Sequence, residues 1–330
     1  MEQATQEAEL RPADIWQARA RLRPHVWRTP LLHSAALSER TRCQVYLKME
    51  CWQLCGCFKV RGAINMVSAL PPTQQARGLV TASSGNHGIA MAYAARLLGG
   101  LPATVFLPEG ADRTKVRKIE ALGAEARLGG AHYLAALDRA QAHAAAQGAT
   151  YVHSHAHPLI MAGQGTIGLE IVEELPDVQA IVTPIGGGGL VSGVAVAAKS
   201  MSDRVRIIGV EPTAAPGAYL SFRDGVCRER IELKPTIADG LSGGLAPLAW
   251  QVARHLIEQV VLVEDVDTAR AMRAFLEDEQ LIIEGASAVT LAALLTGGVD
   301  LRGQRVALIL SGRNIAATRF ADALRLAETA

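Results

Sequence analysis

The sequence predicts an α/β protein made of two alternating units, with mostly parallel sheets flanked by helices around a shared cleft. From residue 78 the chain repeats strand, glycine-containing turn and helix, and a second series of this kind begins at residue 180. Alternation of this kind is typical of parallel sheets. With 330 residues, 49% of them apolar, the chain is also long enough to fill two cores.

Composition argues against several functional classes. The 33 basic and 32 acidic residues leave a formal charge of +1, and no long basic run occurs, so we expect no nucleic-acid surface. The N-terminal segment is rich in charged residues, and no apolar stretch is long enough to span a bilayer as a helix. These features predict a cytoplasmic globular protein without membrane contact.

The first sixty or so residues lead to a lysine that we expect to be buried. Apolar residues at helical spacing predict a helix over 13–22, which Asp14 could cap. Extended chain at 28–31 and a strand at 44–50 follow. Small and apolar residues after Lys59 place this lysine at the buried start of a helix.

Burial would give Lys59 a chemical role. A buried amine is held neutral more easily, and a neutral amine attacks aldehydes, as a Schiff-base lysine must. Taken alone, the stretch also fits a lysine whose stem packs at a helix N-terminus while its ammonium group reaches water. The motifs further along the chain favour the first interpretation.

The first alternating unit is expected to end near residue 153. Its elements in order are strand 78–82, turn 83–88, helix 89–98, strand 103–107, a helix through Lys115 and Ile119, helix 134–147 and strand 150–153. A helix at 166–175 then connects to the second unit.

The second unit is expected to end in a polar turn. Its elements are strand 180–185, a tetraglycine turn, a helix of small residues, strand 205–210, a loop-rich stretch at 212–244, helices 267–278 and 286–295, and strand 305–310. Ser311 follows the last strand directly. Because the carboxyl ends of parallel strands open into one crevice, the turns and Ser311 should meet there.

The turn Gly186, Gly187, Gly188, Gly189 follows a strand and precedes a helix. Bare backbone amides at a helix N-terminus form a cradle for an anion such as phosphate. A dinucleotide is one rival ligand, although Ser192 stands where its fingerprint needs a third glycine. A purely structural turn is the other alternative.

The turn at 83–88 and Ser311 offer further polar groups to the crevice. Amides and hydroxyls of the turn suit a carboxylate, and Asn86 could bond a phenolic oxygen. We interpret His87 as a satisfied structural histidine rather than a base. Ser311 could donate a hydrogen bond to a pyridine nitrogen without protonating it, which suits elimination better than transamination.

Five cysteines, an odd number, stand at positions 43, 51, 55, 57 and 227. The three that cluster include no Cys-x-x-Cys pair, and no histidine lies at ligand-like spacing. We therefore expect reduced thiols rather than a zinc site.

Five segments in this order resemble the fold-type II pyridoxal phosphate enzymes, and most closely the serine/threonine dehydratase and serine racemase group. The segments are 58–63, 83–88, 162–166, 186–190 and 311–314. The resemblance covers nearly the whole chain. It implies a tryptophan synthase β-like fold, with a large domain of residues 1–53 plus 152–330 and a small domain of 54–151, and a homodimer.

The resemblance also implies roles for individual residues. Lys59 would form the Schiff base with pyridoxal 5'-phosphate, Asn86 would contact its 3-hydroxyl group, and Ser311 would meet its pyridine nitrogen. The implied cofactor-binding set is Phe58, Lys59, Asn86, Gly186, Gly187, Gly188, Gly189, Leu190 and Ser311. The implied substrate-binding set is Ser83, Ser84, Gly85, Asn86 and His87.

The implied reaction is the dehydration of an L-β-hydroxy amino acid to a 2-oxo acid and ammonia, with Lys59 removing the α-proton. Serine, threonine, phenylserine and hydroxyaspartate are all candidate substrates. The chain is too short for the C-terminal regulatory domain of biosynthetic threonine deaminases, so we expect a catabolic enzyme. Non-catalytic binding of a phosphate-bearing ligand is the alternative outside enzymes.

Some positions depart from the family pattern. Cys57 replaces the usual serine, Arg313 replaces a glycine, and 154–158 replaces a Pro-Phe-Asp-Asp-Pro-like run. Histidines 155 and 157 and Arg313 could therefore select an unusual substrate, or the changes could be surface drift.

Two family features concern racemases. Ser84 is the second base of racemase-like members, so racemisation is the alternative activity. The racemase-type cation site would use Glu211 and the Ala215 carbonyl, but Gly217 stands where an acidic ligand is expected. A divalent cation is therefore doubtful.

Overall fold

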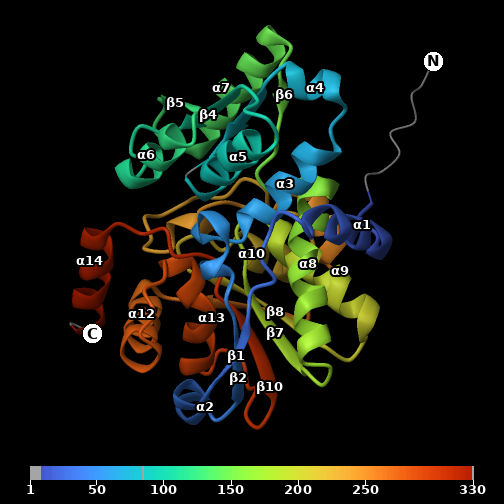
Figure 1. The fold of residues 1–330 in the computed structure, drawn as a ribbon. Helices are drawn as coiled ribbons and strands as arrows, with labels where there is room; N and C mark the ends of the chain where they lie inside the picture. The colour runs from blue at the N-terminus through green and yellow to red at the C-terminus, as the bar shows by residue number, and fades with distance from the viewer. Residues whose placement is uncertain (1–8, 84, 329–330) are drawn as a thin grey trace.

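The computed structural model describes residues 9–83 and 85–328 of the chain. Its strands form two sheets, one of six strands and one of four, and helices cover both (Figure 1). None of the helices in the described residues combines the length and apolar character needed to cross a membrane.

The larger sheet is parallel except for one edge strand. Its order is β1-β2-β10-β7-β8-β9, and only β1 runs antiparallel to its neighbour. The strands are β1 (Leu31–Ser34), β2 (Gln44–Lys48), β7 (Ala180–Pro184), β8 (Arg206–Pro212), β9 (Gln259–Val263) and β10 (Arg305–Ile309). The expected mostly parallel α/β architecture is confirmed.

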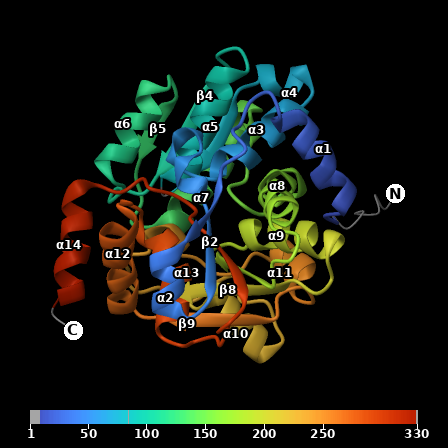
Figure 2. The ribbon, with the colours of Figure 1, turned by 60° about the horizontal axis from the view of Figure 1, so that its bottom comes forward.

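Helices bury both faces of this sheet. Successive residues of β7 point to opposite faces, so Val182 packs in one core and Ile181 in the other. The first core is closed by α2 (Ala35–Thr41), α12 (Asp265–Glu279), α13 (Gly285–Leu295) and α14 (Ala317–Glu328). The second is closed by α1 (Pro12–Leu22), α8 (Pro158–Glu174), α9 (Gly189–Met201), α10 (Gly217–Asp224) and α11 (Pro247–Ala253), and Figure 2 shows α12 and α13 on one side with α8 and α9 on the other.

The smaller sheet is wholly parallel, in the order β5-β4-β3-β6. Its strands are β3 (Leu79–Ala82), β4 (Ala103–Leu107), β5 (Glu125–Leu128) and β6 (Thr150–Tyr151). One face packs on α7 (Tyr133–Gln147), and the other on α3 (Lys59–Ala69), α5 (Asn86–Leu97) and α6 (Arg113–Ala121); the short α4 (Pro72–Ala76) follows α3. Because all four strands fall within residues 54–151, we propose that range as the small domain.

Helices α3 and α8 cross closely between the two sheets. A Cβ atom added at Gly163 would lie 2.7 Å from the Arg61 carbonyl oxygen, and one at Gly62 would lie 2.8 Å from the Ile160 carbonyl oxygen. Glycine is therefore required on both helices for this approach. The crossing fixes Lys59, the first residue of α3, relative to the larger sheet.

Some local expectations were wrong. Asp14 is not the N-cap of α1: Arg11 occupies that position, and the Asp14 carboxylate accepts from its backbone N–H. Helix α8 begins at Pro158 rather than near residue 166, and the supposed loop at 212–244 contains α10 and a short 3-10 helix at Asp239–Leu241. Elements α2, α4, β5, α11, β9 and α14 were not expected.

Candidate active site

A cavity of about 500 Å³ lies where the carboxyl ends of strands from both sheets meet. Every described residue of the two expected binding sets lines it, namely Phe58, Lys59, Ser83, Gly85, Asn86, His87, Gly186, Gly187, Gly188, Gly189, Leu190 and Ser311. The expected second base, Ser84, lies outside the described residues. Segments more than two hundred residues apart in sequence thus form one site.

Lys59 extends from the first turn of α3 into this cavity. Its Nζ donates to the Ser154 carbonyl oxygen at 3.1 Å and lies 5.2 Å from the centre of the Phe58 ring. Burial lowers the pKa of Lys59 to about 8, although the nearby Glu284 carboxylate opposes this shift. The ammonium form still predominates at pH 7, but the neutral amine is far more populated than for an exposed lysine.

The tetraglycine turn joins β7 to the N-terminus of α9. Gly188 has a φ of +88°, a conformation that residues with side chains rarely adopt. A Cβ atom at Gly187 would collide with the His155 ring, and one at Gly189 would lie 2.6 Å from the His155 carbonyl oxygen. The turn thus offers bare amides at a helix N-terminus, which fit a phosphate group.

The turn after β3 is organised by Ser83. The Ser83 hydroxyl oxygen accepts from the backbone N–H groups of Gly85 and Gly88, each at 2.9 Å. Helix α5 starts at Asn86, so Asn86 and His87 lie in its first turn. Amides at this helix N-terminus favour an anionic group such as a carboxylate.

His87 is not the satisfied histidine that we expected. Neither ring nitrogen has a hydrogen-bond partner within residues 9–83 and 85–328, although both atoms are buried. Burial lowers the pKa of His87 to about 3, and the charge of Lys59 adds to this effect. A neutral imidazole with unpaired nitrogens lines the cavity.

The Asn86 amide is held in one orientation by two partners. Its Nδ2 donates to the Glu284 carboxylate at 2.8 Å, and its Oδ1 accepts from Asn314 Nδ2 at 2.9 Å. The same Nδ2 also donates to the second Glu284 carboxylate oxygen at 3.1 Å. Donation to a phenolic oxygen in the cavity would therefore replace part of the contact with Glu284.

Ser311 follows β10 and contacts Ser287 of α13. The two hydroxyl oxygens are 3.1 Å apart, and Ser287 donates its own hydrogen to the Gly312 carbonyl oxygen at 2.7 Å. Ser311 is therefore the donor of the pair. Because a hydroxyl rotates freely, Ser311 can redirect this hydrogen to an acceptor in the cavity.

Sequence reasoning missed Glu284, which precedes α13. Burial raises the pKa of this carboxyl to about 7, and Lys115 opposes the shift. Lys115 itself forms an ion pair with Asp239 at 3.3 Å, which joins α6 to the 3-10 helix Asp239–Leu241 at the cavity wall. The sequence signal was weak, because a glutamate before a helix most often serves only its N-terminus.

Of the three departures expected near the pocket, only one lines it. His155 lies in the cavity wall, whereas the His157 ring nitrogen Nδ1 accepts from Leu159 N at the start of α8. Arg313 is exposed and does not line the cavity. For His157 and Arg313 the structure therefore favours the second alternative, surface drift, over a role in selecting the substrate.

The residues expected for the cation site of racemase-like members offer few free oxygens. Both carboxylate oxygens of Glu211 accept backbone N–H groups, from Ala218 at 2.8 Å and Tyr219 at 2.9 Å. Burial raises the pKa of Glu211 to about 8. No group of three or more metal-binding side chains occurs among the described residues, and Gly217 adds no oxygen from a side chain.

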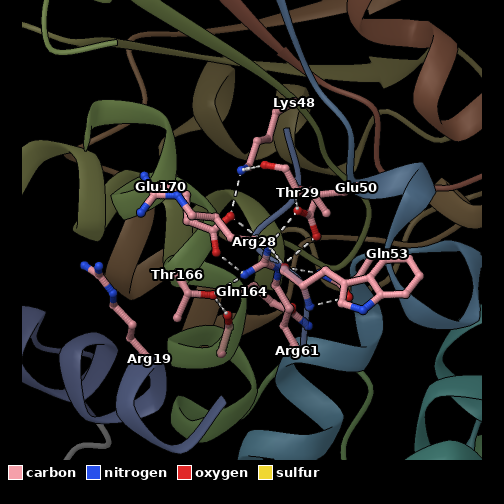
Figure 3. Close-up of polar contacts among 12 residues, drawn as sticks. Arg19, Arg28, Thr29, Lys48, Glu50, Gln53, Arg61, Gln164, Thr166 and Glu170 are labelled. Carbon is pink, nitrogen blue, oxygen red and sulfur yellow. Dashed lines mark hydrogen bonds and ion pairs between the residues drawn. The ribbon is translucent and has the colours of Figure 1, made fainter. Parts of the chain in front are cut away.

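A buried charge cluster anchors the helix that carries Lys59 (Figure 3). Arg61 forms ion pairs with Glu50 at 2.8 Å and Glu170 at 2.7 Å, and Lys48 pairs with Glu170 at 2.6 Å. Two cations and two carboxylates cancel in charge. The cluster ties α3 to α8 and to the end of β2, and so fixes the helix whose first residue is Lys59.

The residues that line the cavity are those of a known enzyme family. Residues 22–312 match the family described as Pyridoxal-phosphate dependent enzyme, and the chain belongs to that family. The aldehyde cofactor fits a buried amine opposite a glycine cradle, since each end of the cofactor meets a group of suitable chemistry.

Particular relatives narrow the class. The chain is 42% identical over 303 residues to the L-threonine ammonia-lyase of Thermotoga maritima, covering 92% of this chain and 75% of that protein. It is 42% identical over 304 residues to a putative threonine dehydratase of Sinorhizobium fredii, covering 91% of each.

Solved structures give the same family. Maize serine racemase superposes with a TM-score of 0.89 at 33% identity, covering 97% of each chain. The processed threonine deaminase isoform 2 of Solanum lycopersicum gives 0.88 at 29% identity, covering 98% of this chain and 96% of that one. The fold-type II architecture expected from the sequence motifs is confirmed.

Proposed function

We propose that the protein is a pyridoxal-phosphate-dependent ammonia-lyase that converts an L-β-hydroxy amino acid of the serine and threonine type to a 2-oxo acid and ammonia. The observation that carries this proposal is the Lys59 amine, buried in the cavity that the tetraglycine turn also lines. The names of the threonine ammonia-lyases and dehydratases among the relatives support it.

Residues of the chain divide the work of this reaction. When bound, the cofactor supplies an aldehyde that captures amines and a ring that accepts electrons from the substrate. The Lys59 Nζ would hold the cofactor covalently and then accept the α-proton, because its pKa near 8 suits proton transfer near neutral pH. Its hydrogen bond to the Ser154 carbonyl orients that nitrogen.

Three other groups would position the reactants. Amides of the turn at 83–88 and the Ser83 hydroxyl would bind the substrate carboxylate. Asn86, oriented by Glu284, would donate to the phenolic oxygen. Ser311 would donate a hydrogen bond to the pyridine nitrogen while keeping its proton, which favours elimination over chemistry that needs a protonated ring.

Racemisation is the second candidate, because maize serine racemase is among the most similar structures reported above. The two activities are separated by measuring keto-acid release and enantiomer interconversion on the same enzyme. Serine, threonine, phenylserine and hydroxyaspartate, in both β-configurations, form the substrate panel. Keto-acid release as the main product supports the proposal, and interconversion without keto acid contradicts it.

The role of Lys59 is tested by absorbance. Lys59→Ala should abolish turnover and the visible band of the Schiff base, whereas Lys199→Ala, near the end of α9 and outside the cavity lining, should keep both. A stable adduct band that survives Lys59→Ala would refute the assignment.

The proposal includes compartment and assembly. Five free cysteines among the described residues fit a reducing compartment such as the cytoplasm. We propose a homodimer, as the family resemblance implies. Light scattering of the eluting protein on a sizing column measures the assembly directly.

A further inference from the structure

His155 lies directly over the tetraglycine turn. Its ring occupies the space that a Gly187 side chain would need, with Nε2 among the closest atoms, and its carbonyl oxygen lies against Gly189. It stands in the run 154–158, where the sequence departs from the family pattern. The reaction described above leaves this side chain without a role.

A chain of hydrogen bonds reaches the Nδ1 atom of the His155 ring. The Tyr133 hydroxyl lies 3.0 Å from Ser154 Oγ, which lies 2.8 Å from His155 Nδ1. When Tyr133 donates to Ser154 and Ser154 donates to Nδ1, the neutral ring carries its hydrogen on Nε2. Within the described part of the chain, Nε2 has no hydrogen-bond partner, and the ring lines the cavity.

We propose that His155 completes the anion cradle by donating an Nε2–H hydrogen bond to the cofactor's phosphate group, and that Tyr133 and Ser154 hold it in the donor tautomer. This inference rests on the proposed function, because it takes the tetraglycine turn as the phosphate site. The amides of the turn and the imidazole then approach the phosphate from two elements, α9 and the segment before α8.

The surroundings of the ring favour a neutral donor. Burial lowers the pKa of His155, and the charges of His153, Lys59 and His87 act in the same direction. An uncharged N–H donor binds phosphate without adding a cation next to Lys59. A protonated imidazole there would instead disfavour the protonated amine further.

The test compares two ligands that differ in the phosphate. Apoenzyme is titrated with pyridoxal 5'-phosphate and with pyridoxal, and the ratio of the two dissociation constants measures the contribution of the phosphate contacts. His155→Phe keeps a ring and removes the donor, whereas His155→Gln keeps an N–H at a position similar to Nε2. His255→Gln, at an exposed position, is the matched control.

The expected result is selective. His155→Phe should weaken binding of pyridoxal 5'-phosphate by at least about tenfold and leave pyridoxal binding unchanged. His155→Gln should restore most of the loss, His255→Gln should match the parent protein, and the ³¹P resonance of the bound phosphate should move only in His155→Phe. If His155→Phe does not fold, Ser154→Ala should change the ratio in the same direction by less.

Other results overturn the inference. Equal weakening of both ligands would show that His155 supports the cavity and not the phosphate. An unchanged ratio together with a raised KM for the amino acid would place the imidazole against the substrate. If the parent protein bound neither ligand, the proposed function itself would fail, which is a distinguishable outcome.

Discussion

Replacing Arg61 by leucine should destabilise the fold strongly. The Arg61 side chain is fully buried and donates to Glu50, Glu170, Thr166 and the Trp27 carbonyl oxygen. Leucine fills part of the volume but leaves two carboxylates facing each other. Removing one partner of a buried ion pair costs about 3–5 kcal/mol, and we expect this cost for Arg61→Leu.

The structure indicates where that cost arises. Glu170 keeps Lys48 as a partner at 2.6 Å, so one of its contacts survives. Glu50 is fully buried, and among the residues that the structure describes its carboxylate keeps one partner, the Thr29 hydroxyl at 2.5 Å. Most of the penalty should therefore come from the Glu50 carboxylate. Adding Glu50→Gln to Arg61→Leu should recover part of the lost stability, because it removes the uncompensated charge.

Urea unfolding at pH 7, followed by far-UV circular dichroism, measures these changes. Arg273→Ala, which breaks an exposed ion pair with Glu277, should leave the midpoint unchanged. The reasoning would be refuted if Arg61→Leu unfolded at the parent midpoint. It would also fail if the double variant were less stable than Arg61→Leu alone.

Three further predictions concern the site. Only a neutral amine attacks an aldehyde, and burial lowers the pKa of Lys59 to about 8. The rate of cofactor uptake by apoenzyme should therefore rise from pH 7 to pH 9 with a midpoint near 8. A flat profile in stopped-flow absorbance would contradict this. Both Glu211 carboxylate oxygens already accept backbone N–H groups, so we expect no essential divalent cation at this residue. Prolonged treatment with EDTA should change activity less than about twofold. A larger loss that Mg²⁺ restores would contradict this prediction. Burial raises the pKa of the Cys57 thiol, so iodoacetamide should label the partly exposed Cys227 of the native protein first, as peptide mass mapping can determine.

The alternation of apolar strands and glycine turns was enough to predict the architecture. The prediction failed where close packing between two helices requires residues that are poor helix formers. Helix α8 begins eight residues earlier than the sequence predicted. The prediction missed this part because Gly163, Gly165 and Gly168 lower the intrinsic helix propensity of the segment. These glycines are needed for close approach: a Cβ at Gly165 would lie 2.8 Å from the Gly193 carbonyl oxygen. The glycines that allow α8 to pack closely on α9 are therefore the same residues that weaken the helix pattern in the sequence.

That the residues at strand ends line one cavity was predictable, because each belongs to a short local motif. Their partners were not, since the contacts join distant parts of the chain. Asn86 and Glu284 are 198 residues apart, and Lys59 and Ser154 are 95 apart. A pattern of residue types carries no information about such pairs, so the orientation of the Asn86 amide became visible only in the folded protein.

The electrostatic setting of Lys59 explains why the strong charges nearby do not fix its protonation state. Arg61 is two residues away on the same helix, but its charge is cancelled by Glu50 and Glu170. Burial lowers the pKa of Lys59 to about 8 and raises that of Glu284 to about 7. Because burial disfavours the charged form of both groups, their pKa values converge toward neutrality, where a small change in the cavity can move a proton onto or off the amine. The neutral cluster thus supplies rigidity, and the cavity itself sets the reactivity of the lysine.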